Sequence, residues 1–533
     1  MMNSTQPGPK NKLVTGAFML LVSSGIDVRD YQRNIAASAL EKNTLVVLPT
    51  GLGKTVVALL VARERLAAFP TGRVLFLAPT RPLVIQHSEF FKTHLSEIAS
   101  TVLTGETVPS LRVELFETSR IIFATPEVIR NDISKGRYSL RDVCLIIFDE
   151  AHRCVRDYAY SQVAEAYKLQ SSSPRILGLT ASPSSRKSRI DEICQRLAIE
   201  GVEARTEVDD DVSGYVNPVA VNWERVALPP VYDRISSILR KVLDEKIERL
   251  QNLHLLPKSV NVNKRTLLEL GDSIRKKLRT ERAGYLYGAL VLQSQGISLF
   301  HAVEMVETQG VRSVTRFLSR LDEKTSRSSL GLAKDPRIIE ALKLCEENIR
   351  EEHPKNQSLR RIITSQLAEK PESKLIVFTQ FRDTADLIVD GLKNIPSATP
   401  VRFVGQATRN MDDIGLKQEQ QVQILDDFKT GRYNVLVTTS IGEEGLHVPD
   451  VDHVIFYEAV PSEIRMIQRR GRTGRTKPGK VTVLMAEGTV DEAYFHSSRR
   501  KERDMHRHLA AFKKDPSPGK RKTTLLDYSS PAN

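Results

Sequence analysis

The chain has 533 residues, of which 40% are hydrophobic and 27% charged, values that exclude a single small domain, general disorder and a membrane-embedded protein. Lysine and arginine number 78 against 65 aspartates and glutamates, and the net charge of +13 favours a polyanionic partner without identifying it. The cysteines lack paired spacing, so we expect neither a zinc site nor a disulfide framework, and we expect a reducing, cytoplasmic location.

An apolar run near the amino terminus is the first feature along the chain. Residues 13–22 follow Lys10 and Lys12, an order that resembles a secretory signal. No small-residue cleavage pattern follows, so we expect a buried first helix that leads into residues 27–31. No other segment approaches the ~18 apolar residues of a membrane span.

Short apolar runs then alternate with longer amphipathic stretches from residue 44 to about residue 207. Strands are predicted at 45–48, 74–77, 121–124, 143–148 and 176–179. Successive parallel strands need a crossover connection, which is usually a helix. This rhythm therefore indicates a parallel sheet with helices on both faces.

A glycine-containing loop follows the first of these strands and leads into an apolar helix. Its residues are Pro49, Thr50, Gly51, Leu52, Gly53, Lys54 and Thr55. Backbone N–H groups of such a loop can face phosphate oxygens, Lys54 can neutralise the β- and γ-phosphates, and the Thr55 hydroxyl can ligate Mg²⁺. Leu48 stands where the usual pattern has glycine, but the flanking strand and helix favour an ATP-binding P-loop over a chance turn.

Two adjacent carboxylates follow the predicted strand 143–148, in the string Asp149-Glu150-Ala151-His152. The carboxyl edge of an open α/β sheet is where ligands bind. Asp149 can hold Mg²⁺ there, and Glu150 can polarise the attacking water. A solvated acidic turn is the alternative, and the hydrophobic strand that precedes the pair argues against it.

The middle of the chain, from about residue 229 to residue 345, has a different pattern. Apolar residues between 235 and 250 recur at helical spacing, and strand-like runs are nearly absent, so we expect a helical insertion. Arg312, Arg316 and Arg320 fall at steps of four and could contact a duplex backbone, as could the basic cluster 275–279. A solvated helix face is the alternative interpretation.

A second set of strands is predicted at 374–379, 401–404, 434–438, 454–457 and 480–485. Between the last two lies an arginine-rich segment, 468–475, with Gln468, Arg472 and Arg475 at i, i+4 and i+7, which is one face if the segment is helical. Glycines between them permit close approach, and arginine supplies planar, permanently charged donors for a γ-phosphate. We interpret the segment as catalytic rather than as a generic basic surface helix.

In this order, the motifs resemble those of superfamily 2 DEAH-box helicases, most closely archaeal Hef and the Fanconi anaemia group M translocases, with the RIG-I/Dicer group as further relatives. The resemblance runs to about residue 508 and also includes the segments 31–32, 78–83, 125–127, 179–182, 377–381 and 403–406. It implies an α/β fold with two RecA-like parallel-sheet lobes and an α-helical domain inserted between them. We expect lobe 1 at 1–212, the helical insertion at 213–345, lobe 2 at 346–511 and a basic flexible tail at 512–533.

The resemblance also implies roles for further residues. Arg29 and Gln32 would read adenine, Gly442 and Glu444 would belong to the nucleotide site, and Thr180 with Ser182 would link that site to the nucleic-acid path. The positions that would contact the sugar-phosphate backbone are Thr80, Arg81, Gln86, Thr104, Gly105, Thr125, Thr379, Gln380, Gly405 and Thr438. Contacts of this kind fix the position of the protein along the nucleic acid but do not recognise the base sequence.

The resemblance predicts an ATP- and Mg²⁺-dependent helicase or translocase, acting on branched or fork DNA in replication and repair. An RNA-stimulated helicase of the RIG-I/Dicer kind uses nearly the same motifs, and a nucleic-acid-binding scaffold without ATPase activity is a further alternative. The nuclease signature of full-length Hef-like proteins is absent, so we expect any nuclease to be a separate partner. Residues Lys522 to Tyr528 resemble a sliding-clamp docking peptide, with a plain disordered end as the alternative.

One departure from the family pattern gives a test. His447 stands where relatives commonly carry an aspartate that accepts from the nucleotide ribose. We therefore predict that His447→Asp leaves ATP turnover intact or tightens nucleotide binding, measured by steady-state ATPase assays and nucleotide titration. A large loss of turnover would contradict this interpretation.

Overall fold

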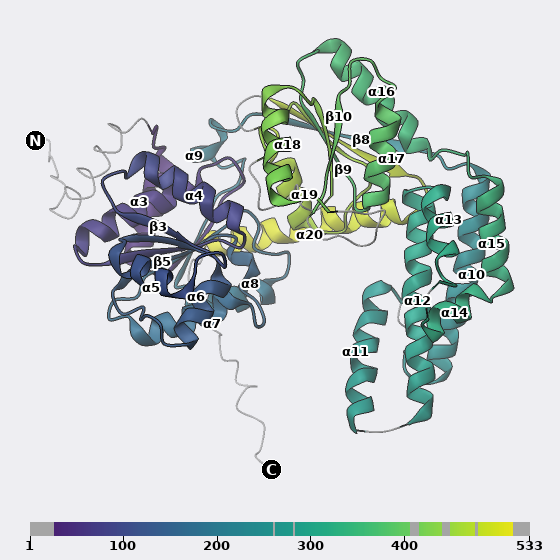
Figure 1. The fold of residues 1–533 in the computed structure, drawn as a ribbon, viewed down its shortest axis with the longest axis horizontal. Coiled ribbons are helices and arrows are strands. Elements are labelled where there is room, and N and C mark those ends of the chain that lie inside the picture. The colour runs from purple at the N-terminus through teal and green to yellow at the C-terminus, as the bar shows by residue number, and fades with distance from the viewer. Residues whose placement is uncertain are drawn as a thin grey trace, which may run out of the picture.

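The computed structural model describes residues 26–259, 262–280, 283–323, 325–405, 415–439, 448–474 and 478–514. Two α/β lobes lie side by side, a helical domain extends beyond the second lobe, and one long helix, α20, runs from the second lobe back to the first (Figure 1). The predicted fold class, two parallel-sheet lobes with a helical insertion, is confirmed.

Lobe 1 is built on a seven-stranded parallel sheet in the order β3-β4-β2-β5-β6-β1-β7. Its strands are β1 (Thr44–Val47), β2 (Arg73–Leu77), β3 (Ser100–Leu103), β4 (Ile121–Ala124), β5 (Val143–Phe148), β6 (Ile176–Thr180) and β7 (Gly201–Ala204). Its helices are α2 (Asp30–Glu41), α3 (Lys54–Ala68), α4 (Arg81–His94), α5 (Pro109–Thr118), α6 (Pro126–Ser134), η1 (Ala151–Arg153), α7 (Ala159–Gln170), α8 (Lys187–Arg196) and α9 (Asp210–Ser213). The central strands are buried on both faces, which explains their continuous apolar runs.

The insertion is entirely helical in its described residues. It comprises α10 (Pro230–Asn252), α11 (Lys264–Thr280), α12 (Gly284–Thr308), α13 (Val311–Ser319), α14 (Arg327–Ala333) and α15 (Pro336–Glu347). The helical periodicity predicted α10 correctly, because Ile235, Leu239, Val242, Leu243 and Leu250 form its buried stripe. Two apolar clusters, one near lobe 2 and one around α11, hold the helices together.

Lobe 2 contains a six-stranded parallel sheet in the order β10-β11-β9-β12-β13-β8. Its strands are β8 (Val219–Val226), β9 (Leu375–Phe378), β10 (Pro400–Phe403), β11 (Val435–Thr438), β12 (His453–Phe456) and β13 (Gly479–Ala486), and its helices are α16 (Pro354–Glu369), α17 (Arg382–Leu392), α18 (Gln418–Thr430), α19 (Glu463–Arg470) and α20 (Val490–Lys514). The expected insertion at 213–345 includes β8, but this strand pairs along its length with β13 of lobe 2. It was missed because its residues are mostly exposed or half-buried, so no continuous apolar run marks it.

Helix α20 crosses from lobe 2 to lobe 1 and contacts β7 (Figure 1). Its last turns insert Met505, Leu509 and Phe512 into the apolar core of lobe 1, where each is at least nine-tenths buried. The expected tail at 512–533 thus begins too early, since Phe512 belongs to this packed helix. The clamp-like peptide and the apolar run 13–22 lie outside the described residues.

Within the described ranges, no helix combines the length and apolar character needed to cross a bilayer. Cys144, Cys154, Cys194 and Cys345 are all buried free thiols. No three histidine, cysteine or acidic side chains among the described residues are grouped closely enough to hold a metal ion by themselves.

The anchoring of α20 gives the second prediction. Leu509→Ala removes a buried side chain from the lobe 1 core and should lower the free energy of unfolding by about 2–5 kcal/mol, measured by urea unfolding followed by circular dichroism. Leu169→Ala on α7 is the control, because Leu169 is 84% exposed and its loss should have little effect. Equal stability of the two variants would show that α20 does not anchor lobe 1.

Candidate functional site

The P-loop has the local geometry that its sequence predicts. Gly53 precedes α3 with a φ of 75°, a left-handed conformation that favours glycine. A Cβ atom at Gly53 would overlap the Gln32 side-chain nitrogen and displace it from the Leu52 carbonyl, so the close approach of α2 also favours glycine. Lys54 Nζ donates to the Leu48 carbonyl at 3.1 Å. The lysine therefore lies folded over the loop at the amino end of α3, where phosphate binding is favoured.

Residues expected to read adenine lie directly against this loop. Gln32 Nε2 and Tyr31 Oη both donate to the Leu52 carbonyl, at 3.1 and 2.8 Å. The Arg29 guanidinium lies 4.6 Å from the centre of the Tyr215 ring, a cation–π distance. Tyr215 was missed by sequence reasoning, because it follows α9 in the connection between the lobes and only the fold brings it to α2.

The acidic pair lies at the end of β5, as predicted. Glu150 has a φ of 48°, unusual for a residue with a side chain, and this sharp turn directs Asp149 and Glu150 differently. Asp149 is 6% exposed, and its carboxylate lies 2.9 Å from His87 Nε2. Burial alone would raise the pKa of Asp149, but His87 and Lys54 outweigh it and the pKa lies below its ordinary value.

His87 is a site residue that sequence reasoning missed, although the neighbouring Gln86 was chosen. A signal was present, because Val84, His87, Ser88 and Phe91 follow helical i, i+3, i+4, i+7 spacing and form the buried face of α4. A histidine on such a face must find a polar partner inside the protein. Here that partner is the first carboxylate of the acidic pair.

Thr180, which we expect to link the ATP site to the nucleic-acid path, lies close to the acidic pair through His152. His152 Nδ1 lies 3.1 Å from the Thr180 hydroxyl and 3.2 Å from the Glu150 carboxylate, so the two motifs share one imidazole. The Ser182 backbone N–H donates to the same hydroxyl at 3.2 Å. The Ser182 hydroxyl itself is buried and has no hydrogen-bond partner among the described residues.

The arginine-rich segment of lobe 2 meets the P-loop of lobe 1. A Cβ atom at Gly471 would lie 1.7 Å from the Thr50 hydroxyl oxygen, so only glycine permits this contact. Gln468 and Arg472 are both buried, at 5% and 9% exposure. They do not share a helix face as predicted, because α19 ends at Arg470 and Arg472 lies in the following turn. Arg475, Gly442, Glu444 and His447 lie outside the described residues.

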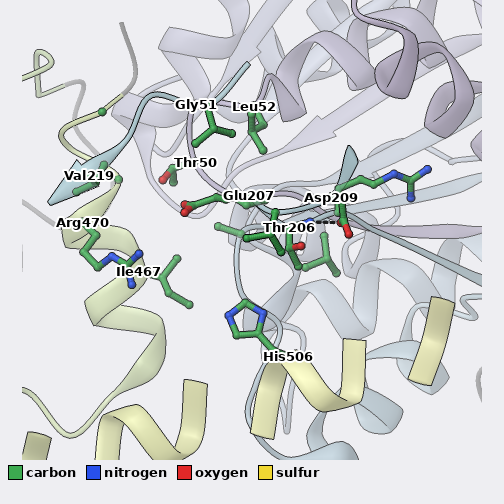
Figure 2. Close-up of a pocket in the computed structure, with 18 of the residues that line it drawn as sticks. Thr50, Gly51, Leu52, Thr206, Glu207, Asp209, Val219, Ile467, Arg470 and His506 are labelled. Carbon is green, nitrogen blue, oxygen red and sulfur yellow. Dashed lines mark hydrogen bonds between the residues drawn. The ribbon is translucent and has the colours of Figure 1, made fainter. Parts of the chain in front are cut away.

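A cavity of about 490 Å³ lies beside this contact. Pro49, Thr50, Gly51 and Leu52 of the P-loop form one wall, and the opposite wall comes from α19 and α20. Figure 2 shows Thr50 and Gly51 at the top of the cavity, Ile467 and Arg470 at its lower left, Thr206 to the right and His506 at the lower right. Arg470 is held by Glu502 of α20 at 2.9 Å. The cavity is thus composite, with both lobes and the crossing helix in its lining.

The expected backbone-contacting residues of lobe 1 gather at one sheet edge. Thr80, Thr104 and Thr125 each follow the carboxyl end of a neighbouring strand, β2, β3 and β4. Gly105 is exposed, Gln86 is half-buried and Thr104 is buried. Arg81 pairs with Glu106 and reaches Gln418 of lobe 2 at 3.4 Å. This edge is therefore a second place where the lobes approach each other.

The corresponding residues of lobe 2 lie at the carboxyl ends of β9, β10 and β11, again at one edge, with Thr438 as the last residue of β11. Gln380 and Gly405 are partly exposed, whereas Thr379 and Thr438 are fully buried. The Thr379 N–H donates to the Thr438 carbonyl at 2.9 Å, and the Thr379 hydroxyl donates to Glu458. These two threonines therefore lie beneath the surface, in a supporting position rather than the surface position that we expected.

The arginine stripe of the insertion also differs from expectation. Helix α13 ends at Ser319, so Arg320 caps it and the stripe does not continue along one helix. Arg316 pairs with Asp383 of lobe 2 at 3.1 Å, and Arg312 donates to the Ile349 carbonyl at 3.1 Å. Both arginines thus contribute to the junction of the insertion with its surroundings in this structure.

Comparison with known proteins agrees with this arrangement. Residues 29–190 match the family DEAD/DEAH box helicase, and residues 354–477 match the helicase conserved C-terminal domain. Residues 231–350 match the helical bundle of a family of ATP-dependent RNA helicases. The crystal structure of the Pyrococcus furiosus Hef helicase domain is 43% identical, covers 88% of this chain and 98% of its own, and superposes with a TM-score of 0.66. The chain belongs to the Hef-type helicases of superfamily 2.

Other Hef-type relatives come from archaea, fungi and animals. A Methanocaldococcus jannaschii protein, provisionally named an ATP-dependent RNA helicase, is 39% identical over 92% of this chain and 62% of its own length. The ATP-dependent DNA helicase mph1 of Neurospora crassa is 32% identical over 88% of this chain and 42% of its own. The Fanconi anemia group M protein homolog of mouse is 31% identical over 93% of this chain and 26% of its own length. The predicted resemblance to superfamily 2 helicases of the Hef and Fanconi group M type is confirmed, and the chain spans less than two thirds of the length of these relatives.

The contact between His87 and Asp149 gives the third prediction. His87→Ala removes the partner that orients the carboxylate and should lower the turnover number for ATP by about 10–100-fold, in line with other positioning residues around metal ligands. The control is His94→Ala on the same helix, whose ring packs on Phe90. Steady-state ATPase assays compare the two variants. If His87→Ala has wild-type turnover, His87 does not belong to the site.

Proposed function

We propose that this chain is a DNA-directed ATPase that translocates on and remodels branched DNA such as stalled forks. The observation that carries the proposal is the contact of Gly471 with Thr50, which brings the arginine segment of lobe 2 onto the P-loop of lobe 1. ATP bound between the lobes would contact both, so binding and hydrolysis would open and close them. The DNA helicase names of the fungal relatives support the substrate.

The residues of lobe 1 suit ATP with Mg²⁺. Lys54 and the Thr55 hydroxyl lie at the amino end of α3, and Asp149 keeps a lowered pKa, so it offers an ionised carboxylate to a hard cation. Thr55 and Asp149 would hold the ion, which supplies charge neutralisation at the phosphates when bound. Lys54 would bind the β- and γ-phosphates, with the loop residues 49–53 around them. Arg29 and Gln32 would hold adenine.

Glu150 would orient and deprotonate the attacking water, since it is the second carboxylate of the pair and shares His152 with Thr180. Gln468 and Arg472, with Arg475, would approach the γ-phosphate from lobe 2 and stabilise the charge that develops there. His152 and Thr180 would pass the state of the γ-phosphate to the strand-binding edge. ATP turnover would then depend on closure of the two lobes.

The nucleic acid would lie across the two sheet edges that carry Thr80, Arg81, Gln86, Gly105 and Thr125 in lobe 1 and Gln380 and Gly405 in lobe 2. Hydroxyl, amide and backbone N–H groups at these edges suit phosphate contacts, which set register without reading bases. The exposed cluster 275–279 on α11, together with Arg312, Arg316 and Arg320, would extend the basic surface along the insertion. Sliding-clamp and nuclease partners stay predictions.

RNA-stimulated activity is the second candidate, because the archaeal relative and the helical-bundle family both carry RNA helicase names. Phosphate contacts alone do not separate the two substrates, whereas the 2′-hydroxyl of RNA offers an additional contact. The two proposals therefore differ in which polynucleotide stimulates ATP hydrolysis.

The fourth prediction compares these substrates directly. Steady-state ATPase rates with fork DNA, linear duplex DNA, single-stranded DNA and duplex RNA should be highest for fork DNA. Glu150→Gln removes the base but keeps the side-chain shape, and it should lower turnover by a factor on the order of 10²–10⁴ with every polynucleotide. Stimulation by RNA alone would replace the DNA proposal by the RNA one.

A further inference from the structure

The end of α12 is rigidly attached to lobe 2. Gln309 caps this helix, and Gly310 follows with a φ of 107°, where a Cβ atom would lie 3.2 Å from the His353 side chain. His353 Nε2 in turn lies 3.1 Å from the Glu307 carbonyl. The turn after α12 therefore has little freedom, and the Gln309 side chain is presented to lobe 2 from a defined position.

Glu458, in the segment after β12, receives that side chain. Gln309 Nε2 donates to one Glu458 oxygen at 3.2 Å, and the Thr379 hydroxyl donates to the same oxygen at 3.2 Å. The other oxygen accepts from the backbone N–H of Gln380. Thr384 Oγ1 donates to the side-chain oxygen Oε1 of Gln309 at 2.6 Å and helps to hold the amide in this orientation. One carboxylate thus joins the insertion to the two motif residues that follow β9.

The surroundings of Glu458 explain how a carboxylate is tolerated there. Glu458 is 1% exposed, and Arg469 of α19 lies over the Phe378 and Phe456 rings at 4.9 and 5.5 Å. Burial raises the pKa of Glu458 to about 7, against the lowering effect of Lys355 and Arg469, while Asp491 raises it further. Burial of a carboxylate without hydrogen-bond partners lowers the stability of the folded protein. A buried carboxylate such as Glu458 therefore needs well-placed donors to both of its oxygens.

We propose that Glu458 is a positioning residue, which holds Gln380 and its sheet edge at a defined place relative to the helical insertion. Gln380 is the partly exposed residue through which this edge would meet the sugar-phosphate backbone, and the insertion would contact the same polynucleotide. Glu458 therefore makes the insertion and lobe 2 bind the strand as one unit. The inference rests on the proposed nucleic-acid function.

Two variants of the full chain test it by different routes. Glu458→Gln keeps the shape and removes the charge. Thr384→Val removes the hydrogen bond to the Gln309 side-chain oxygen and leaves the amide held through its nitrogen by Thr308 and Glu458, with Glu458 and Gln380 themselves unchanged. Each should raise the fork-DNA concentration that gives half-maximal ATPase stimulation. The increase should be roughly tenfold for Glu458→Gln, which weakens hydrogen bonds to a charged group, and roughly threefold for Thr384→Val, which loses a hydrogen bond between neutral groups. The ATPase rate without DNA should stay unchanged in both.

Thr482→Val is the matched control. Thr482 is also a buried lobe 2 threonine, and its hydroxyl lies 2.8 Å from His453 Nε2, so its loss perturbs the lobe core without touching Gln309. Its half-maximal fork-DNA concentration should equal that of wild type. An equal shift in this control, or no shift in Thr384→Val, overturns the inference. If Glu458→Gln fails to fold, Thr384→Val decides alone.

The pH profile gives an independent readout. Protonation of Glu458 weakens one of its oxygens as an acceptor. The wild-type protein should therefore need more fork DNA for half-maximal ATPase stimulation as the pH falls through about 7. Glu458→Gln should lack this part of the pH dependence and resemble wild type at low pH. An unchanged profile overturns the inference. If fork DNA does not stimulate the ATPase activity of the wild-type protein at all, the proposed function is wrong as well. A failure of the inference alone leaves that stimulation intact, so the two failures can be distinguished.

Discussion

The close contact between Thr50 and Gly471 is the constraint on which the active arrangement depends. It leaves no room for a side chain at position 471, and it places the arginine segment of one lobe against the phosphate loop of the other. Catalytic groups that come from two bodies act only when those bodies are together. Hydrolysis can therefore be coupled to lobe movement, since any change at the γ-phosphate acts on both sides of the contact.

Three physical links carry this coupling through the rest of the molecule. His152 joins the acidic pair to Thr180 within lobe 1, and Glu458 joins the insertion to lobe 2. Helix α20 joins lobe 2 to the core of lobe 1 through apolar contacts. The first two are polar and directional, so they define orientation, whereas the third is an apolar anchor that is stabilised by burial.

The residues that we propose to contact the nucleic acid illustrate how a parallel sheet organises such a site. Thr80, Thr104 and Thr125 are separated by long helices in sequence but lie at one edge, because parallel strands all present their carboxyl ends there. Thr379 and Thr438 obey the same rule, yet burial makes them support the surface instead of forming it. Topology thus brings motif residues together, and side-chain packing decides which of them face the ligand.

Local patterns in the chain predicted most strands of the two sheets, the helical insertion, the P-loop and the acidic pair, because apolar periodicity and glycine-dependent turns are local properties. The sequence alone could not place β8 in the second sheet, bring Tyr215 to Arg29, or show that α19 ends before Arg472. It also could not show that His87 meets Asp149 or that Gln309 meets Glu458. Those contacts join residues far apart in the chain, and only the tertiary structure decides them, since a buried polar group takes whichever partner the fold brings within reach.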